Sequence, residues 1–237
     1  MFVTTKGIIL RTYPFKENKI ICKIFTEEKG LVSFIAKKNK EQIILSQALN
    51  IVEITYKCSN TYSLFFVSEC SADYVYTNLL SNGRKLSYAM IICEILNKCI
   101  NNVNVELFNF IISSFKWLDS SRGEIKGFEI LFLIKFCRLN GIQPLANNVS
   151  FKAPYKLDLF EGKYTNDIQK ETLKYKISCN ESAEIYNLSK LEFNNLHGNN
   201  ISILNPNKIL EHIVKYISIH LSDISNLNSI KILKELN

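Results

Sequence analysis

The sequence predicts an α+β protein in which a five-stranded OB-fold barrel precedes an all-helical domain. The first 78 residues contain five short runs rich in β-branched and aromatic residues, and turn-forming residues separate these runs. After Asn78 the apolar residues recur at three- and four-residue steps, which is typical of amphipathic helices. Because 47% of the chain is hydrophobic, both parts can bury a core. We therefore expect a barrel domain at 1–78 and a helical domain at 79–237.

The predicted strands are rich in Ile, Val, Phe, Tyr and Thr, the residues that favour pleated surfaces. The connection between the second and third strands, Glu27–Gly30, is short enough for a hairpin. The five strands are Val3–Arg11, Lys19–Thr26, Gly30–Lys37, Asn50–Lys57 and Tyr62–Glu69.

Two helices are predicted directly after the barrel. The first spans Arg84–Ile100 and the second Val105–Leu118. Their expected buried faces contain Leu86, Ala89, Met90, Cys93, Leu96 and Ile100 in the first helix, and Phe108, Ile111, Ile112 and Phe115 in the second.

The rest of the chain is predicted to hold three more helices and a small insert. A third, more deeply buried helix spans Glu124–Asn140, because Gly141 is a natural stop and Pro144 forbids its continuation. An irregular insert follows at about 142–180, with a hairpin at Tyr155–Thr165 that turns at Glu161-Gly162. The last two helices are Ser182–Leu196, ended by Gly198, and a helix capped by Asn205 that runs from Pro206 through His220 and buries Ile209, Ile213, Ile217 and Leu221.

Positive charge is concentrated at the start of the chain. The formal net charge is +7, and the first forty residues hold nine lysine or arginine residues against three glutamates, an excess of six. A local surplus of this kind favours a polyanion as partner. A solvated basic surface is the alternative explanation of the same charges.

The residues that would bind single-stranded DNA combine cations with flat side chains, which hold phosphates and stack on bases. In an OB-fold the second and third strands present the oligonucleotide face. The same residues could instead protect strand edges, with Tyr13 and Phe15 filling the barrel. The predicted DNA-binding residues are Arg11, Tyr13, Lys16, Lys19, Lys23, Lys37, Lys38 and Lys40.

No constellation of catalytic residues is recognisable, so we expect a protein that is not an enzyme. The eight glycines form no phosphate-binding motif. His212 and His220 are eight residues apart, whereas two metal ligands on one helix are usually three or four apart. None of the seven cysteines stands out as a nucleophile, although a cysteine and a histidine could still meet in space. We expect no cofactor and no metal.

The opening stretch resembles the start of bacterial RecO recombination-repair proteins. The resemblance continues at Glu69, at Arg84–Leu96, at Gly127–Gly141 and at Tyr216–Leu236. It departs from the family where Lys38 replaces a glycine, and where Cys179 is the single cysteine between 142 and 200, in a region where many RecO proteins hold zinc with four. The matching positions at the start are Gly7, Ile8, Ile9, Leu10, Arg11, Tyr13, Phe25, Thr26, Gly30, Leu31, Ala36 and Lys37.

This resemblance implies a repair mediator that binds single- and double-stranded DNA, anneals complementary strands and, with RecR, helps to load RecA. It also implies binding to the acidic, apolar C-terminal tail of the single-strand-binding protein. Such a tail needs an apolar groove flanked by cations, for which the third helix offers Lys126, Phe132, Lys135 and Arg138. The same four residues would also fit an ordinary core helix with a polar edge.

Two alternatives from other classes remain. The chain could be an adaptor that binds only proteins, or a hydrolase that uses a cysteine and a histidine. The N-terminus has no apolar segment long enough for a signal peptide, and the longest apolar stretch, Gly127–Cys137, is too short to span a bilayer. We expect a cytoplasmic, nucleoid-associated protein with no membrane contact.

Overall fold

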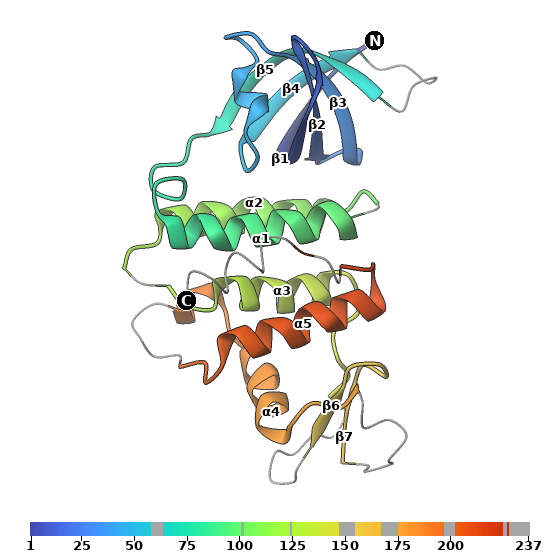
Figure 1. The fold of residues 1–237 in the computed structure, drawn as a ribbon, viewed down its shortest axis with the longest axis vertical. Helices are drawn as coiled ribbons and strands as arrows, with labels where there is room; N and C mark the ends of the chain where they lie inside the picture. The colour runs from blue at the N-terminus through green and yellow to red at the C-terminus, as the bar shows by residue number, and fades with distance from the viewer. Residues whose placement is uncertain are drawn as a thin grey trace. The chain divides into compact units, whose positions relative to one another are not determined.

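A computed structural model describes residues 1–57, 64–100, 102–123, 125–146, 155–166, 175–196, 202–224 and 227. These residues form two compact units, Met1–Ser120 and Ser121–Asn237 (Figure 1). The first unit contains the barrel together with the first two helices. The predicted domain boundary after residue 78 falls inside this unit, and the division into domains at 1–78 and 79–237 stays a prediction.

The first unit begins with a closed five-stranded barrel. The strands are hydrogen-bonded in the order β1-β2-β3-β5-β4, and β1 closes the barrel by pairing with β4. All neighbouring strands are antiparallel except β3 and β5, which run parallel. The barrel, followed by a helical region, confirms the predicted fold class. The strands are β1 Phe2–Lys16, β2 Lys19–Thr26, β3 Gly30–Lys37, β4 Ile51–Lys57 and β5 Leu64–Tyr74.

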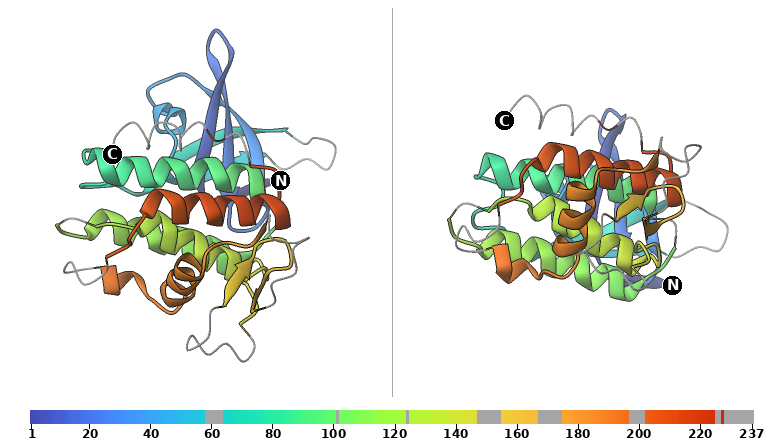
Figure 2. Two further views of the ribbon diagram at one scale, coloured as in Figure 1. Left: turned by 60° about the horizontal axis from the view of Figure 1, so that its bottom comes forward. Right: turned by 90° about the horizontal axis from the view of Figure 1, so that it is seen from below.

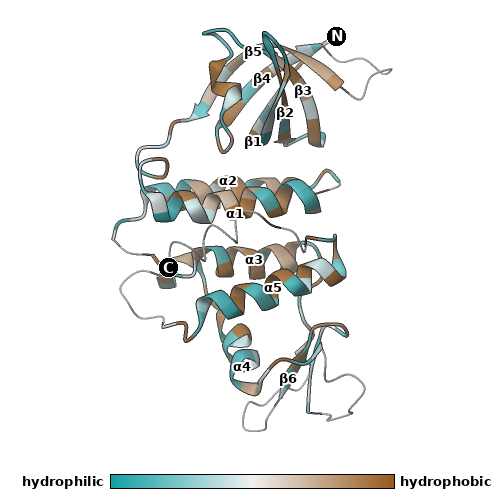
Figure 3. Cartoon of the chain, in the orientation of Figure 1, coloured by the Kyte–Doolittle hydropathy of each residue, from teal (hydrophilic) through white to brown (hydrophobic). Residues whose placement is uncertain are grey.

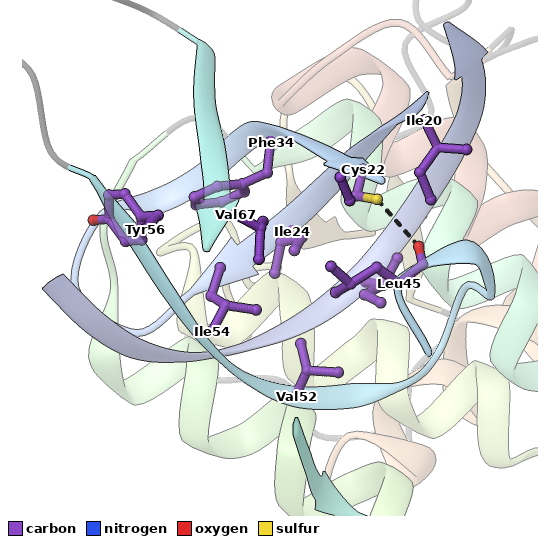
Figure 4. Close-up of a cluster of buried hydrophobic side chains, with 11 residues drawn as sticks. Ile20, Cys22, Ile24, Phe34, Leu45, Val52, Ile54, Tyr56 and Val67 are labelled. Atoms are coloured by element: carbon purple, nitrogen blue, oxygen red, sulfur yellow. Dashed lines mark hydrogen bonds between the residues drawn. The ribbon is translucent and has the colours of Figure 1, made fainter. Parts of the chain in front are cut away.

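Side chains from all five strands fill the interior of the barrel, and in β2, β3 and β4 they are alternate residues (Figure 4). In β2 these are Ile20, Cys22 and Ile24, each less than 5% exposed. The short helix η1, Ile43–Ser46, adds Leu45 to this core, and the Cys22 thiol donates a hydrogen bond of 3.1 Å to the Leu45 carbonyl. Figure 3 shows the resulting mixture of polar and apolar residues along the strands.

Two strands are longer than the sequence predicts. β1 continues past Arg11 to Lys16, because β-bulges at Ile9/Arg11 and Pro14/Lys16 bend the strand while pairing with β2 continues. Proline is tolerated at such a position, since a bulge needs no regular ladder bond there. β5 continues to Tyr74, while the first predicted residues of that strand, Tyr62 and Ser63, lie outside the described residues.

Helices α1, Gly83–Cys99, and α2, Val105–Ser120, complete the first unit. The Asn82 side chain caps α1 by accepting from the Lys85 N–H. Most of the predicted apolar face of α1 is buried, but the expectation for Met90 is wrong because this side chain is 43% exposed. Leu86 in α1 and Ile112 in α2 are partly exposed, whereas Phe108, Ile111 and Phe115 are buried.

Asp119, near the end of α2, holds the connection between β5 and α1. Its carboxylate is 1% exposed and accepts hydrogen bonds from the N–H groups of Thr77, Asn78 and Leu79, at 2.7–3.1 Å. The hydroxyls of Thr77 and Tyr74 also donate to it. Burial alone would raise the pKa of this carboxyl, but the three N–H donors and the Tyr74 hydroxyl lower it to about 2.

The second unit is built around α3, Phe128–Leu139, which packs against α5, Pro206–His220. α3 begins later than the predicted residue 124 because Gly127, with φ +78°, precedes it as a left-handed cap. The single helix expected at Ser182–Leu196 is wrong. A capping box at Ser178 and Glu181 starts α4 earlier, at Cys179–Leu188, and a separate 3₁₀ helix, η3, covers Phe193–Leu196. Gly198 lies outside the described residues.

α5 begins as the sequence predicts, with Asn205 as its cap and Pro206 at its first position. It buries Ile209, Ile213 and Ile217, while Leu221 is partly exposed. The described part of the chain contains no helix long and apolar enough to cross a membrane.

The predicted hairpin is present as β6, Lys156–Asp158, and β7, Lys163–Thr165, and Gly162 adopts φ +65° in its turn. It belongs to the second unit with α4 and α5 (Figure 2). His220 of α5 hydrogen-bonds the Leu159 carbonyl at 2.9 Å, and Ser182 of α4 accepts from the Leu157 N–H at 2.8 Å. Side chains of two helices therefore hold this short hairpin in place.

Candidate nucleic-acid interface

Strand alternation sets which side chains of the barrel face outward. Ile20, Cys22 and Ile24 of β2 point into the core, so Lys19, Ile21 and Lys23 point to the outer surface. Residues directly opposite one another in paired strands lie on the same face. The outward residues of β2 therefore continue into β1 and β3 as rows.

Three adjacent rows cross the outer face of β1, β2 and β3, and β5 extends two of them. They are spaced two residues, about 7 Å, apart along β2 and β3, and the bulge at Pro14/Lys16 adds one residue between the first two rows in β1. We name them the lysine row, Lys16, Lys19 and Lys37; the apolar row, Tyr13, Ile21, Ile35 and Phe66; and the arginine row, Arg11, Lys23, Ser33 and Leu64.

The apolar row thus lies between two rows of cations. Tyr13 pairs with Ile21, Ile21 with Ile35, and Ile35 with Phe66. Phe66 is 57% exposed and Tyr13 and Ile21 are partly exposed, whereas Ile35 is buried. An exposed aromatic ring on this face can stack on a base, while the rows at its sides can contact phosphates.

Within the described residues, no carboxylate lies within 4 Å of the cationic groups of these two rows. Several cations instead lie over aromatic rings. The Arg11 guanidinium is 4.8 Å from the centre of the Tyr13 ring, and the Lys19 ammonium is 5.6 Å from that of Phe66. Their positive charge is therefore available to a ligand.

The loop after β3 adds positive charge next to the lysine row. The Lys38 N–H donates to the Asn18 carbonyl in the turn between β1 and β2, at 2.9 Å. Gln42, which is 5% exposed, accepts from the Lys37 N–H at 2.7 Å and so fixes the loop from inside. Lys38 does not need the left-handed backbone that a glycine would allow. Lys40 is exposed in the same loop.

The sequence did not predict Phe66 as a residue of this face. It also did not distinguish Lys6, which has an acidic partner, from the other cations of the first forty residues. Phe66 is in the fifth strand, and only its parallel pairing with β3 brings it beside Ile35. Lys6 is tied to Asp73 by an ion pair of 2.6 Å, which raises its pKa. Phe15 does not fill the barrel, since it is 43% exposed and the Lys16 ammonium lies 5.5 Å from its ring centre.

The residues expected to bind a partner's tail have mixed placements. Phe132 is fully buried, and the Lys135 ammonium forms an ion pair of 2.7 Å with Glu192. Lys126 and Arg138 are exposed. The structure therefore leaves two of the four at the surface without placing them around an apolar groove.

The described residues contain no cluster of three or more His, Cys, Asp or Glu side chains that could hold a metal ion. Burial raises the pKa of the Cys22 thiol to about 12 and that of Cys99 to about 11, and it raises the pKa of Cys93 as well. These thiols are consequently poor nucleophiles. Cys58 and His197 lie outside the described residues.

Two family models match this chain. "Recombination protein O N terminal" matches residues 1–74, which include the three rows, and "Recombination protein O C terminal" matches residues 80–224. Curated relatives named "DNA repair protein RecO" include those of Phocaeicola vulgatus, 26% identical, and Bacteroides fragilis, 25% identical, with 100% of this chain and 99% of each relative aligned. The relative from Porphyromonas gingivalis is 21% identical with the same coverage. The chain belongs to the RecO family of DNA repair proteins.

Proposed function

We propose that this RecO family member binds single-stranded DNA across the three rows of its barrel and anneals complementary strands during repair. The observation that carries the proposal is a partly exposed apolar row between two rows of cations that have no carboxylate partner among the described residues. No chemical step is part of this function.

Annealing in this proposal is an electrostatic process. Two strands repel one another through their phosphates, and a protein that neutralises those phosphates releases counterions and lets the strands approach. The lysine and arginine rows hold the backbone, and the apolar row keeps bases unstacked from their own strand. The bases are then free to test pairing with a second strand.

The partners follow from the resemblance to RecO proteins. We propose that the chain also contacts duplex DNA, RecR and the acidic tail of the single-strand-binding protein, and so assists RecA loading. Lys126 and Arg138 are exposed, whereas Phe132 is buried. The apolar part of a tail therefore has to contact side chains other than Phe132.

A salt titration tests the electrostatic part of the proposal. Affinity for a labelled oligothymidine is measured by fluorescence anisotropy, and its logarithm should fall with the logarithm of salt concentration by roughly 0.7 per phosphate neutralised. The double variant Lys19→Glu/Lys23→Glu should bind at least about tenfold more weakly with a smaller slope. Lys57→Glu, an exposed lysine of β4 outside the rows, is the matched control. Unchanged binding by the double variant contradicts the proposal.

Stacking on the apolar row is tested separately with abasic DNA. The wild-type chain should prefer oligothymidine to an abasic strand of equal length, because stacking contributes about 1–3 kcal/mol per base. Phe66→Ala should lose most of this preference and keep its salt slope. Phe2→Ala, which removes another exposed ring of β1, should retain the preference.

The adaptor function is the second candidate, and the same titration separates the two. An adaptor binds a protein partner with no measurable affinity for naked DNA, so the double variant and the wild type would be indistinguishable in the anisotropy experiment.

A further inference from the structure

The second unit has a cleft between α5 and the segment that enters α4. Its volume is about 280 Å³. One wall is formed by Lys208, His212 and Lys215 of α5, and the other by Tyr175, Lys176 and the capping residues of α4. The spacing of four and then three residues places the three α5 side chains on one helix face. None of its lining residues belongs to the three rows of the barrel.

The lining of the cleft is basic. Lys176, Lys208 and Lys215 stand against one acidic residue, Glu181, which leaves an excess of two positive charges when His212 is neutral. Clefts lined by one sign of charge attract ligands of the opposite sign. The ligand should therefore be an anion.

Glu181 is a structural carboxylate that already pairs with one of the three lysines. It accepts from the Ser178 hydroxyl at 2.7 Å and the Ser178 N–H at 3.2 Å, and it pairs with Lys208 at 2.6 Å. Burial would raise its pKa, but the bonds from Lys208 and Ser178 lower the pKa to about 2. Glu181 thus uses Lys208, while Lys215 on the same face is exposed and forms no ion pair within the described residues.

Aromatic rings accompany these cations. The Lys215 ammonium is 5.4 Å from the centre of the Tyr175 ring, and that ring is 5.4 Å from Phe160, which is 57% exposed. Cations beside an exposed flat ring are the combination that holds single-stranded nucleic acid. The rings favour a nucleotide chain over an acidic peptide, because every base has a face on which such a ring can stack.

We propose that this cleft is a second nucleic-acid site, which takes a backbone phosphate on Lys215 and a base on Phe160, whose ring lies beside the lining residue Tyr175. A chain with two sites can hold two strands at once, and this consequence rests on the annealing function proposed above. Each of the two units would then bind one DNA strand.

Residual binding in a barrel variant tests this site. In the Lys19→Glu/Lys23→Glu background, oligothymidine should still bind with a measurable salt dependence. Adding Lys215→Glu should lower that residual affinity by about tenfold, as expected for a reversed phosphate contact. Adding Lys190→Glu, an exposed lysine outside the cleft, should change it less than about twofold. No residual binding, or residual binding that ignores Lys215→Glu, overturns the proposal.

Phe160→Ala in the same background provides a test that changes no charge. It should weaken binding of oligothymidine but not of an abasic strand. A labelled oligo-aspartate serves as the acidic-peptide probe, and tighter binding of this probe than of oligothymidine would assign the cleft to a protein partner instead. Full DNA affinity in the Lys19→Glu/Lys23→Glu variant would count against DNA binding by the barrel. This outcome differs from the loss of residual binding that would count against the cleft.

Discussion

In the barrel, backbone pairing alone decides where Lys19 and Lys23 point, whereas the cleft of the second unit depends on side chains that meet from distant parts of the chain. The rows of the barrel are consecutive partners in a hydrogen-bonded ladder. The cleft instead depends on the ion pair between Lys208 and Glu181. The hairpin beside it depends on the hydrogen bond between His220 and the Leu159 carbonyl.

This difference has a consequence for how each region responds to mutation. Replacing an outward side chain of the barrel leaves the ladder intact, so binding can be changed without loss of fold. Replacing a tethering side chain in the second unit removes part of the scaffold itself. The carboxylates of Asp119 and Glu129 extend the contrast. Asp119 has a full set of donors, whereas the Oε2 atom of Glu129 has no hydrogen-bond partner among the described residues.

The largest effect on stability is expected at Asp119. This residue belongs to the first unit, but it holds the backbone through its side chain and not through strand pairing. Asp119→Ala leaves three N–H groups and two hydroxyls without their acceptor, so the free energy of unfolding should fall by about 3–5 kcal/mol. Urea unfolding measures this, with Glu106→Ala, exposed on the same helix, as control. A loss below about 1 kcal/mol would mean that water replaces the carboxylate.

A smaller effect is expected at Gly162, in the turn of the hairpin. A Cβ atom there would lie 2.9 Å from the Tyr216 hydroxyl, in addition to the cost of φ +65°. Gly141→Ala is a matched control because Gly141 has φ +71° and open space around its Cβ. Gly141→Ala should cost about 1–2 kcal/mol by backbone strain, and Gly162→Ala about 1–2 kcal/mol more. Equal costs would show that Tyr216 moves away freely.

The buried carboxyl groups of Asp119 and Glu129 should make contributions to stability that change in opposite directions with pH. Burial raises the pKa of Glu129 to about 7 from 4.5, so the folded state binds a proton more tightly than the unfolded state. Stability from this group is complete below about pH 4.5 and is lost as the pH rises towards 7, by up to about 3 kcal/mol. The pKa of Asp119 is lowered from 3.8 to about 2. The stability that this group contributes is therefore lost as the pH falls from about 3.8 to about 2.

Glu129→Gln should remove the loss between pH 4.5 and 7 and leave the acid limb in place. Thermal unfolding at a series of pH values measures both limbs. An unchanged profile in Glu129→Gln would show that water reaches this carboxyl and restores its ordinary pKa.

The barrel rows were largely predictable because strand alternation and short turns are local properties of the sequence. Lys19 and Lys23 could be assigned to one face of the second strand, whereas Tyr13 and Lys16 lie beyond the predicted end of the first strand at Arg11. Phe66 could not, because a parallel pairing between β3 and β5 depends on how the barrel closes. The side chain is adjacent to Ile35 in space and thirty-one positions away in the sequence.

The second unit was less predictable for the same reason. Periodicity indicated α5 and its cap, since Asn205 and Pro206 are a local signal. It did not reveal that α4 ends at Leu188, nor that Phe132 is fully buried. Burial of Phe132 depends on packing between distant helices, and an apolar helix pattern alone does not separate a groove from a core.

The smallest effect on stability is expected at the ion pair between Lys135 and Glu192. The same pair tests whether Lys135 belongs to the predicted tail site. Glu192 is 73% exposed on its side chain, so solvent screens the pair and Glu192→Gln should change the free energy of unfolding by less than about 1 kcal/mol. The same change frees Lys135 for an anion. If Lys135 contributes to a tail site, Glu192→Gln should tighten binding of an acidic, apolar peptide by about twofold to fivefold, measured by anisotropy at low salt. Lys135→Gln should then weaken it, whereas equal affinities in both variants would remove Lys135 from the site and leave Lys126 and Arg138 as its predicted cations.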